Sequence, residues 1–511
     1  MQGKKNYQEK LFIKFQLSDH IPADNLYRRL NELIDFSFLY KATAGYYGTE
    51  GQKSIDPVVF MKLILAGYLE NLNSDRRIIS ALGLRLDIRY FVGYDLDEPL
   101  PWHSTLSRTR QLYGEHVFMD LFKRVLGQCI DKGIVSGKRQ AIDSVFIKAN
   151  ASMDSMLRKG IMADAVVYGK ELEENQEDKE HKGYVQGKPE PDKPAEDQPL
   201  TVSYNPEYKP VKKGMQKVKS ETHYSPVDPD ARLSVKKGKR VALNYLGQVC
   251  VDTESHVITH VQAFKADTRD SECLPGLLSR ISGTLSSYNM VVKEVLADTN
   301  YSSGTALKAL VAMGITGYIP NIGGYKFERE HFTYHPDGDY YKCRNGKQLK
   351  LQGVYDGDKR YTRTQKDCAG CPFKDACIGD KREVALTETI YKPYYDQMHL
   401  RMQTKEAKSA KLKRQSTAEP VIGTLVDYHG MKKVNSRGID QVNKCLTMAA
   451  IAYNLKKLLK YKLPIKQRGN QTTGINGRKD RFISLLTFIS TKNYMILKIS
   501  RSDYSNPIFS V

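Results

Sequence analysis

Three acidic residues occupy positions that are unusual for a carboxylate. Asp143 interrupts the apolar segment 139–148, Asp298 follows the apolar segment 290–297, and Glu419 lies among lysines and arginines. Hard divalent cations such as Mg²⁺ prefer oxygen ligands, and carboxylates that leave coordination positions open for phosphate suit them. Two such ions can activate water or a 3′-hydroxyl and stabilise the leaving oxygen of a phosphodiester. The three acids therefore predict metal-dependent phosphoryl transfer, provided that the fold brings them together.

Each acid also has a structural interpretation, and its own position leaves both interpretations open. Ser416 and Glu419 have the spacing of a capping box, in which the two side chains bond backbone N–H groups at a helix start. Asp298 fits an Asp turn or a helix cap. Asp143 could face solvent on one side of an edge strand, since aspartate is a poor strand former.

The segments around the acids predict an α/β core. Strand patterns cover residues 139–148, 240–252, 256–263, 290–297 and 314–320, and helical patterns lie between the later ones. Strands followed by a strand–helix–strand unit indicate a sheet with antiparallel and parallel parts. Asp298 follows its strand directly, at the edge where open α/β sheets bind ligands. An amphipathic helix over residues 440–459 is expected to pack on this sheet.

Residues 1–135 have helical patterns. Asp24 is expected to cap a first helix, Asp56-Pro57 places a cap and a helix-starting proline at a second, and Gly83 is expected to end a third. A later helix starts at His103 and carries Arg108 and Arg110 near its beginning. Short helices with a basic helix start suit a helix-turn-helix-like DNA reader, and an ordinary helical bundle is the alternative.

The composition favours a polyanionic partner. The 79 lysines and arginines exceed the 58 acids, which gives a formal charge of +21 at pH 7. Such an excess suits nucleic acid, because these cations release counterions when they neutralise phosphates; a solvated basic surface is the alternative. The chain has no apolar run of about 18 residues, and its N-terminus lacks the apolar core of a signal peptide. We expect a cytoplasmic, nucleoid-associated protein that binds double-stranded DNA and no membrane.

Four of the eight cysteines are clustered in the sequence. Cys368 and Cys371 are separated by two residues and Cys377 follows closely, so their thiolates can converge on one tetrahedral ion, with Cys343 as a fourth ligand from a hairpin. The spacing predicts structural Zn²⁺, and reduced, metal-free cysteines are the alternative. So few cysteines in a long chain favour a reducing compartment over a disulfide framework.

The motifs around the three acids, taken in order, resemble those of the DDE transposases of bacterial insertion sequences. They cover residues 143–152, 297–303 and 414–423, with Arg437-Gly438 beyond. The resemblance is to the branch with a cysteine-bearing insert between the second and third acids. The N-terminal helices, ending at His103–Arg108, also resemble that family's DNA-binding domain, and the likeness extends over about residues 10–465.

The resemblance implies an α/β, RNase H-like catalytic core with a mixed sheet, preceded by an all-helical DNA-binding domain. Its first acid would lie on the first strand, its second after the fourth strand and its third on a following helix. Asp143, Asp298 and Glu419 would then be catalytic and bind Mg²⁺ or Mn²⁺. Arg414 and Tyr301 would contact DNA or the catalytic acids. The full set of DNA-binding candidates is Arg108, Arg110, Tyr301, Arg414, Lys432, Lys433 and Arg437.

The domains expected on this basis are a helix-turn-helix-like DNA-binding domain at 1–135 and an RNase H-like DDE domain at 136–465. Two inserts interrupt the second domain. Residues 165–230 are charged and proline-rich, which predicts a flexible segment, and residues 320–395 contain the clustered cysteines. Residues 466–511 form a basic and then mixed tail to which the sequence assigns no role.

The implied activity is that of a transposase. It would bind terminal inverted repeats as a homodimer, hydrolyse the phosphodiester at the element ends and join the freed 3′-hydroxyl to target DNA by a two-metal mechanism. One position departs from the family: many relatives have lysine seven residues after the glutamate, where this chain has Val426. Lys432 or Lys433 could substitute, or this copy could be impaired. A non-catalytic DNA-binding protein, decayed or regulatory, and a nuclease with the same core are the alternatives.

Overall fold

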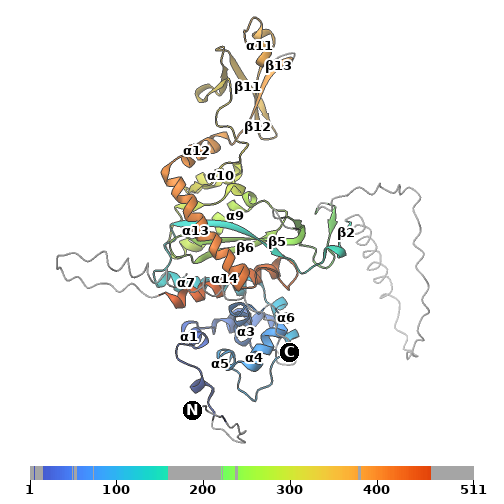
Figure 1. Cartoon of the computed structure of the whole chain (residues 1–511), viewed down its shortest axis with the longest axis vertical. Helices are drawn as coiled ribbons and strands as arrows, with labels where there is room; N and C mark the ends of the chain where they lie inside the picture. Colours follow the sequence, from blue (N-terminus) through green and yellow to red (C-terminus); the bar gives the residue numbers. More distant parts are fainter. Residues whose placement is uncertain are drawn as a thin grey trace, which may run out of the picture. The chain divides into compact units, whose positions relative to one another are not determined.

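A mixed sheet carries the first of the predicted acids (Figure 1). The structure is a computed structural model that describes Lys5 and residues 15–461, with gaps at 49, 51–53, 73, 159–219, 221, 236–239 and 378–380. Within these ranges the sheet has six strands: β1 (Arg139–Lys148), β4 (Arg232–Ser234), β5 (Ala242–Asp252), β6 (Ile258–Lys265), β7 (Glu294–Leu296) and β8 (Thr316–Tyr318). The predicted mixture of antiparallel and parallel strands is confirmed.

The register of this sheet determines where the acids stand. β6, β5 and β1 are antiparallel neighbours, and β7 and β8 continue the sheet in parallel with β1. Arg139 pairs with Glu294 and Ala141 pairs with Leu296. The same register, continued by two residues, brings Asp298 beside Asp143. Residues 240–252, which suggested one or two strands, form a single strand β5.

Two apolar cores cover the two faces of the sheet. On one face, Ile142, Leu246 and Cys250 pack with α9 (Asp270–Ser286) and α10 (Gly304–Ala312). On the other face, Ile147 and Val249 belong to a core that also contains α7 (Glu115–Asp131) and α14 (Ile439–Lys460). Since side chains alternate along a strand, Asp143 points toward the second face and Ser144 toward the first.

Helix α14 is buried on almost all sides, whereas its sequence suggested an amphipathic helix with one apolar face. It contacts β6, α7 and α3 (Pro57–Leu69), so its polar residues face protein as well (Figure 1). The Asn454 amide accepts from the N–H of Ile258 at 2.9 Å and donates to its carbonyl at 2.8 Å, and Asn443 accepts from the N–H of Ala263 at 2.7 Å. These amides satisfy the backbone groups of β6 that no neighbouring strand pairs.

The N-terminal region is helical, as predicted. Asp56 and Pro57 start α3 as expected, but the cap of the first helix is Asn25 instead of Asp24, because the Asn25 side chain reaches the N–H of Tyr27. Gly83 does not end its helix, which continues by one residue. The elements are η1 (Leu17–His20), α1 (Leu26–Leu33), α2 (Phe38–Thr43), η2 (Ala44–Tyr46), α4 (Asp75–Leu84), α5 (Leu86–Val92) and α6 (His103–Leu112). Their apolar residues share one core with α14.

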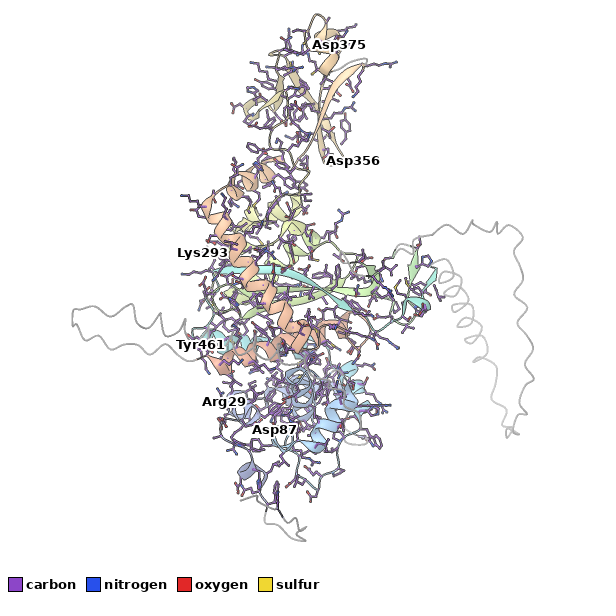
Figure 2. The ribbon with its side chains drawn as sticks, in the orientation of Figure 1. Arg29, Asp87, Lys293, Asp356, Asp375 and Tyr461 are labelled. Carbon is purple, nitrogen blue, oxygen red and sulfur yellow. The ribbon has the colours of Figure 1, made fainter. Side chains whose placement is uncertain are left out.

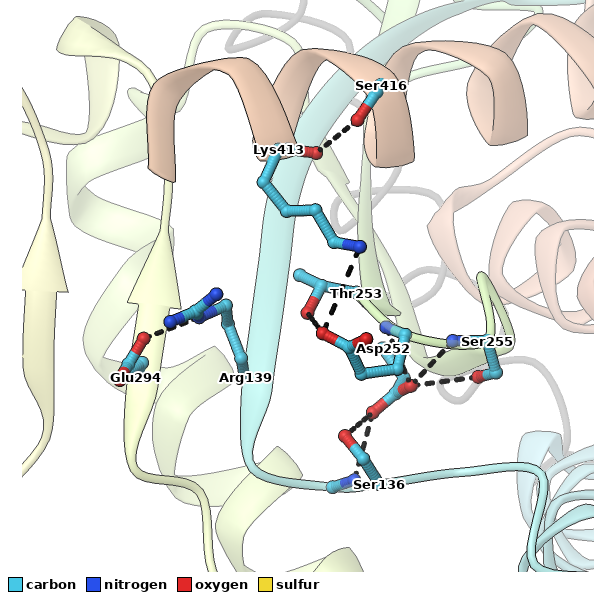
Figure 3. Close-up of polar contacts among 10 residues, drawn as sticks. Ser136, Arg139, Asp252, Thr253, Ser255, Glu294, Lys413 and Ser416 are labelled. Carbon is cyan, nitrogen blue, oxygen red and sulfur yellow. Dashed lines mark hydrogen bonds and ion pairs between the residues drawn. The ribbon is translucent and has the colours of Figure 1, made fainter. Parts of the chain in front are cut away.

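Ion pairs and a buried turn hold the strands that lead to the acids (Figure 3). Arg139 on β1 pairs with Glu294 on β7. Lys413 on α13 (Lys405–Tyr428) lies 3.9 Å from Glu254, just after β5. Asp252 is fully buried and accepts bonds from Ser136, from the N–H of Gly137 and from the turn that follows it. These contacts fix the beginning of β1 and the position of α13.

The cysteine-bearing insert forms a separate antiparallel sheet. Among the described residues its strands run in the order β13, β12, β11, β10, β9. The turn at Asp356 and the helix with Asp375 lie at opposite ends of this sheet (Figure 2). The elements are β9 (Phe332–His335), η5 (Pro336–Gly338), β10 (Tyr340–Cys343), β11 (Gln348–Tyr355), β12 (Asp358–Thr364), η6 (Lys366–Cys368), α11 (Lys374–Cys377) and β13 (Glu383–Thr389). The chain then enters α12 (Lys392–Met402).

The charged insert is shorter than the predicted 165–230. Its end is structured: β3 (His223–Tyr224) pairs with β2 (Leu157–Arg158), which follows η3 (Met153–Ser155), and β4 joins the main sheet. Residues 165–219, which were predicted to be flexible, lie outside the described residues, as does the tail 466–511. No helix in the described ranges has the length and apolar character that crossing a bilayer would require.

Candidate active site

Asp143 is held by an arginine from α13. The Arg414 guanidinium donates to the Asp143 carboxylate at 2.7 Å, and the exposed fractions of the two side chains are 12% and 16%. β1 is a central strand, so Asp143 does not have the edge-strand position that a purely solvent-facing carboxylate would need. A half-buried acid in a central strand with one cationic partner fits a functional position.

Asp298 lies directly beyond β7, as predicted, and shapes the turn η4 (Thr299–Tyr301). Its carboxylate accepts from the N–H of Asn300 at 3.0 Å, so it is the cap that the alternative interpretation foresaw. Its second oxygen accepts from the side-chain amide of Asn300 at 3.3 Å, and its charge lies near Asp143. Burial raises the pKa of Asp143, the N–H of Ser144 and the charge of Arg414 oppose this, and the charge of Asp298 raises it further. Burial likewise raises the pKa of Asp298.

Glu419 does not form a capping box. α13 begins at Lys405 with Thr404 as its cap, so Ser416 and Glu419 lie in the helix interior, where no free N–H groups need them. The Ser416 hydroxyl donates to the carbonyl of Lys413. The Glu419 carboxylate is 58% exposed and lies 3.5 Å from Arg414, on the nitrogen beside the one that binds Asp143. Arg414 thus links the first and the third predicted acid.

The donor chemistry of this site fits a hard divalent cation. Asp143 and Asp298 are carboxylates whose pKa values are raised by burial, and each is raised further by a neighbouring acid, so added positive charge would stabilise their ionised forms. In the described part of the chain, however, no three His, Cys, Asp or Glu side chains are close enough to hold one ion together. The guanidinium of Arg414 lies between Asp143 and Glu419 instead.

Sequence reasoning missed two residues of this site. Asp270, the first residue of α9, accepts from the Gln248 amide at 2.6 Å. Burial raises the pKa of Asp270, bonds from Gln248 and Ser144 lower it, and the charge of Asp143 raises it. Gln248 is a fully buried polar residue inside the apolar strand β5. A polar residue within an apolar strand is the signal that identified Asp143, and it could have identified Gln248.

Tyr301 is fully buried, which corrects the expectation that it contacts DNA directly. Its hydroxyl donates to the Gln248 amide oxygen. Burial raises the pKa of Tyr301, and the charges of Asp270, Asp143 and Asp298 raise it as well. The other expected role of Tyr301, contact with the catalytic acids, stays a prediction, since its hydroxyl binds Gln248.

Several predicted DNA-binding residues line or border one cavity. This cavity of about 610 Å³ lies between helices α3, α4 and α6 and residues 430–437, and it is lined by Arg76, His103, Arg110, Lys433 and Arg437, among others. Asp75 is the single acid among the described residues that line it. Arg110 is not a free cation, because Asp75 binds its guanidinium at 2.5 Å. Arg108 and Lys432 are exposed.

Lys432 and Lys433, which could substitute for the family's lysine at position 426, lie beyond the helix that carries Val426. α13 ends at Tyr428, and the N–H of Val434 bonds the carbonyl of Lys148 at the far end of β1. Lys148 is five residues beyond Asp143, which corresponds to roughly 16 Å along an extended strand. In this structure the two lysines therefore stand away from the acids.

The four clustered cysteines lie near enough to one another to interact electrostatically. Burial raises the pKa of Cys377, Arg344 lowers it, and the charges of Cys343, Cys368 and Cys371 raise it. Cys343 ends β10 at a hairpin, as predicted. Within the described residues, no three of these side chains approach closely enough to share an ion. Zn²⁺ binding stays a prediction from the spacing.

Two protein-family sequence models match the chain. Residues 15–112 match "Transposase domain (DUF772)" and residues 342–459 match "Transposase DDE domain". The first match covers the N-terminal helices through α6, and the second includes Arg414 and Glu419 but neither Asp143 nor Asp298. Together they support a DDE transposase family and a transposase function for this chain.

Comparisons with curated proteins and with solved structures do not assign a family to this chain. No curated protein matches the sequence significantly. A cryo-EM structure of a piggyBac transposase synaptic complex with hairpin DNA aligns over 94% of this chain and 84% of that chain, at 9% identity and a TM-score of 0.30. A likeness at that score carries no argument about this chain.

Proposed function

We propose that the chain is a DDE transposase that binds the terminal inverted repeats of an insertion sequence and catalyses metal-dependent strand cleavage and strand transfer. The observation that carries this proposal is the parallel register of β1 and β7, which leads Asp143 and Asp298 to the same edge of the sheet. Arg414 connects this pair to Glu419, inside the segment that matches the DDE domain.

The sheet order supports an RNase H-like core. Apart from β4, the strands of the main sheet lie side by side in the order β6, β5, β1, β7, β8. Along the chain, the first of these strands is β1, which carries Asp143, and the fourth is β7, which Asp298 follows. Glu419 follows on a helix. This is the distribution of acids that the family resemblance implies.

Asp143, Asp298 and Glu419 would hold Mg²⁺ or Mn²⁺, which supplies a Lewis acid for the scissile phosphate and lowers the pKa of an attacking water or hydroxyl. The chain's own contribution is positioning and charge. β1 and the turn η4 fix two carboxylates. Arg414 neutralises part of their repulsion and, when released from them, offers a planar guanidinium suited to a phosphate.

DNA would follow the cationic residues. Arg76, Lys433 and Arg437 line the cavity beside α6, and the net charge of +21 favours binding to a polyanion. Because two element ends must be joined in one reaction, we also propose that the active form on DNA is a homodimer.

The test uses linear duplex DNA that carries the sequences flanking the gene, with Mg²⁺ or Mn²⁺. Asp143→Asn, Asp298→Asn and Glu419→Gln should each lower the cleavage rate by roughly 10³-fold or more, while DNA affinity should not fall, since these acids repel phosphate. Glu32→Gln, a change of an exposed acid on α1, is the matched control and should cleave normally.

The outcomes separate the alternatives. Normal cleavage by all three acid variants would refute the catalytic assignment. Binding without any cleavage by the wild-type chain would indicate a non-catalytic DNA-binding protein. Cleavage without joined products would indicate a nuclease with the same core.

A further inference from the structure

We propose that Gln248 is a positioning residue of the acidic site, whose buried side-chain amide binds Asp270 at one end and Tyr301 at the other and thereby sets where Asp298 stands relative to Asp143. This inference rests on the proposed function and deepens it. Gln248 and Asp270 lie outside both segments that match transposase families.

The contacts of Gln248 reach both acid-bearing segments. On β5, Gln248 pairs directly with Ser144, the neighbour of Asp143, so the two side chains share one face of the sheet. Its amide oxygen accepts from the hydroxyl of Tyr301, which closes the turn that Asp298 begins. The amide thus links the strand of the first acid to the turn of the second.

The other end of the amide fixes Asp270. The Gln248 nitrogen donates to Asp270 at 2.6 Å, and the Ser144 hydroxyl bonds the same carboxylate. Asp270 is half-buried, and its negative charge repels those of Asp143 and Asp298. Repulsion from Asp143 and Asp298 would displace the Asp270 carboxylate if nothing bound it. The neutral amide of Gln248 binds this carboxylate and leaves its negative charge intact.

An amide suits this position better than other side chains. Asp270 needs a donor and the Tyr301 hydroxyl needs an acceptor, and glutamine supplies both from one planar group. Gln248 has no exposed surface, so water cannot replace either bond. A side chain that supplies neither bond leaves the turn and the start of α9 free to shift, and a displacement of about 1 Å at a reacting centre can cost about 100-fold in rate.

The first experiment compares Gln248→Met and Tyr301→Phe, which remove the bonds with little change in volume. Each should lower Mg²⁺-dependent cleavage of the flanking-sequence duplex by about 10- to 100-fold and weaken Mn²⁺ binding, measured by electron paramagnetic resonance without DNA. The double variant should be no worse than Gln248→Met, since both break one link. Gln352→Met, the same change at an exposed position of β11, is the matched control and should behave as wild type.

The second experiment is a rescue. Gln248→Glu should be defective, because it places two carboxylates in contact. Adding Asp270→Asn exchanges amide and carboxylate, which restores a donor–acceptor bond and leaves an acceptor for Tyr301. Recovery of cleavage and Mn²⁺ binding by at least about tenfold relative to Gln248→Glu, with both variants still folded at the assay temperature by circular dichroism, supports positioning. Losses that only follow unfolding of Gln248→Glu at that temperature would overturn it.

The failures are distinguishable. If the wild-type chain does not cleave, or if Asp143→Asn cleaves normally, the proposed function and this inference both fall. If the wild type cleaves and Asp143→Asn does not, but Gln248→Met and Tyr301→Phe match the wild type in rate and in Mn²⁺ binding, only the role of Gln248 is overturned.

Discussion

At the scale of single residues, the acids that the sequence indicated are distributed around one arginine. The sequence predicted Asp143, Asp298 and Glu419 because each broke a local pattern. It could not indicate Asp270, since an acid at the first position of a helix is ordinary. It could not decide the role of Tyr301 either, because an aromatic residue after an acidic motif suits a DNA contact and a buried support equally well, and only its complete burial separates them.

The raised pKa of Asp298 predicts how the stability of the fold depends on pH. Burial raises its pKa in the folded chain, so its charge opposes folding at neutral pH, and the opposition disappears as the pH falls through the raised folded pKa toward the unfolded value of about 3.9. Asp298→Asn, which keeps a good cap, should therefore melt at a higher temperature than the wild type at pH 7. The difference should shrink on acidification.

Differential scanning calorimetry between pH 7 and pH 4 measures this gap. Glu32→Gln removes an exposed acid on α1 and should leave the melting temperature unchanged at each pH. An Asp298→Asn variant that melts below the wild type at pH 7 would show that the carboxylate stabilises the fold.

At the scale of elements, the strands and most helices follow from sequence patterns, whereas their surroundings do not. The pattern of α14 combines apolar residues with asparagines and lysines, and such a mixture predicts a surface helix. The structure uses the same polar residues inside the protein. Asn454 serves the backbone of β6, and Lys444 and Lys456 donate to the carbonyls of Arg110 and Leu69. These partners lie hundreds of residues away, so no local pattern reveals them.

The Asn454 bonds make a prediction about folding. Asn454→Leu keeps the volume but leaves the N–H and C=O of Ile258 buried without partners, at a cost of about 1–3 kcal/mol for each group. We expect a loss of roughly 2–5 kcal/mol in the free energy of unfolding, measured with urea. Gln415→Leu makes the same kind of exchange at an exposed position of α13 and should change stability by less than about 0.5 kcal/mol. Equal stabilities of the two variants would contradict this account of α14.

At the scale of the whole molecule, one of the two apolar cores of the main sheet is shared with the N-terminal helices. The helices before residue 135 and the main sheet both pack on α14, so the predicted boundary near 135 does not separate two apolar cores. The cysteine-bearing sheet has its own small core of Tyr341, Leu349, Tyr361 and Val384. The sequence located this insert by its cysteines, but its strands are short and polar and gave no clear pattern.

We predict that the rest of the chain folds without the cysteine-bearing insert. Arg329 binds Glu388, and Lys392 donates to the carbonyl of Phe327, so the two ends of the insert lie together. Replacing residues 331–386 with a short Gly/Ser linker should leave the melting temperature of the remaining chain within a few degrees of the wild type, because the linker needs to span only this closed neck. Circular dichroism measures the transition. Aggregation or loss of the cooperative transition would mean that the insert supports the main core.

Two segments of equal length, which we call arms, lead from the ion pair between Arg139 and Glu294 to the acids. Asp143 follows Arg139 by four residues, and Asp298 follows Glu294 by four residues. One residue added to either arm would advance its carboxylate by about 3.3 Å and turn it to the opposite side of the sheet. Loops between these arms can change in length, as the long insert after β1 illustrates, but a residue gained or lost within either arm would separate the two carboxylates. An alignment of homologues should therefore show no gaps in these two short stretches.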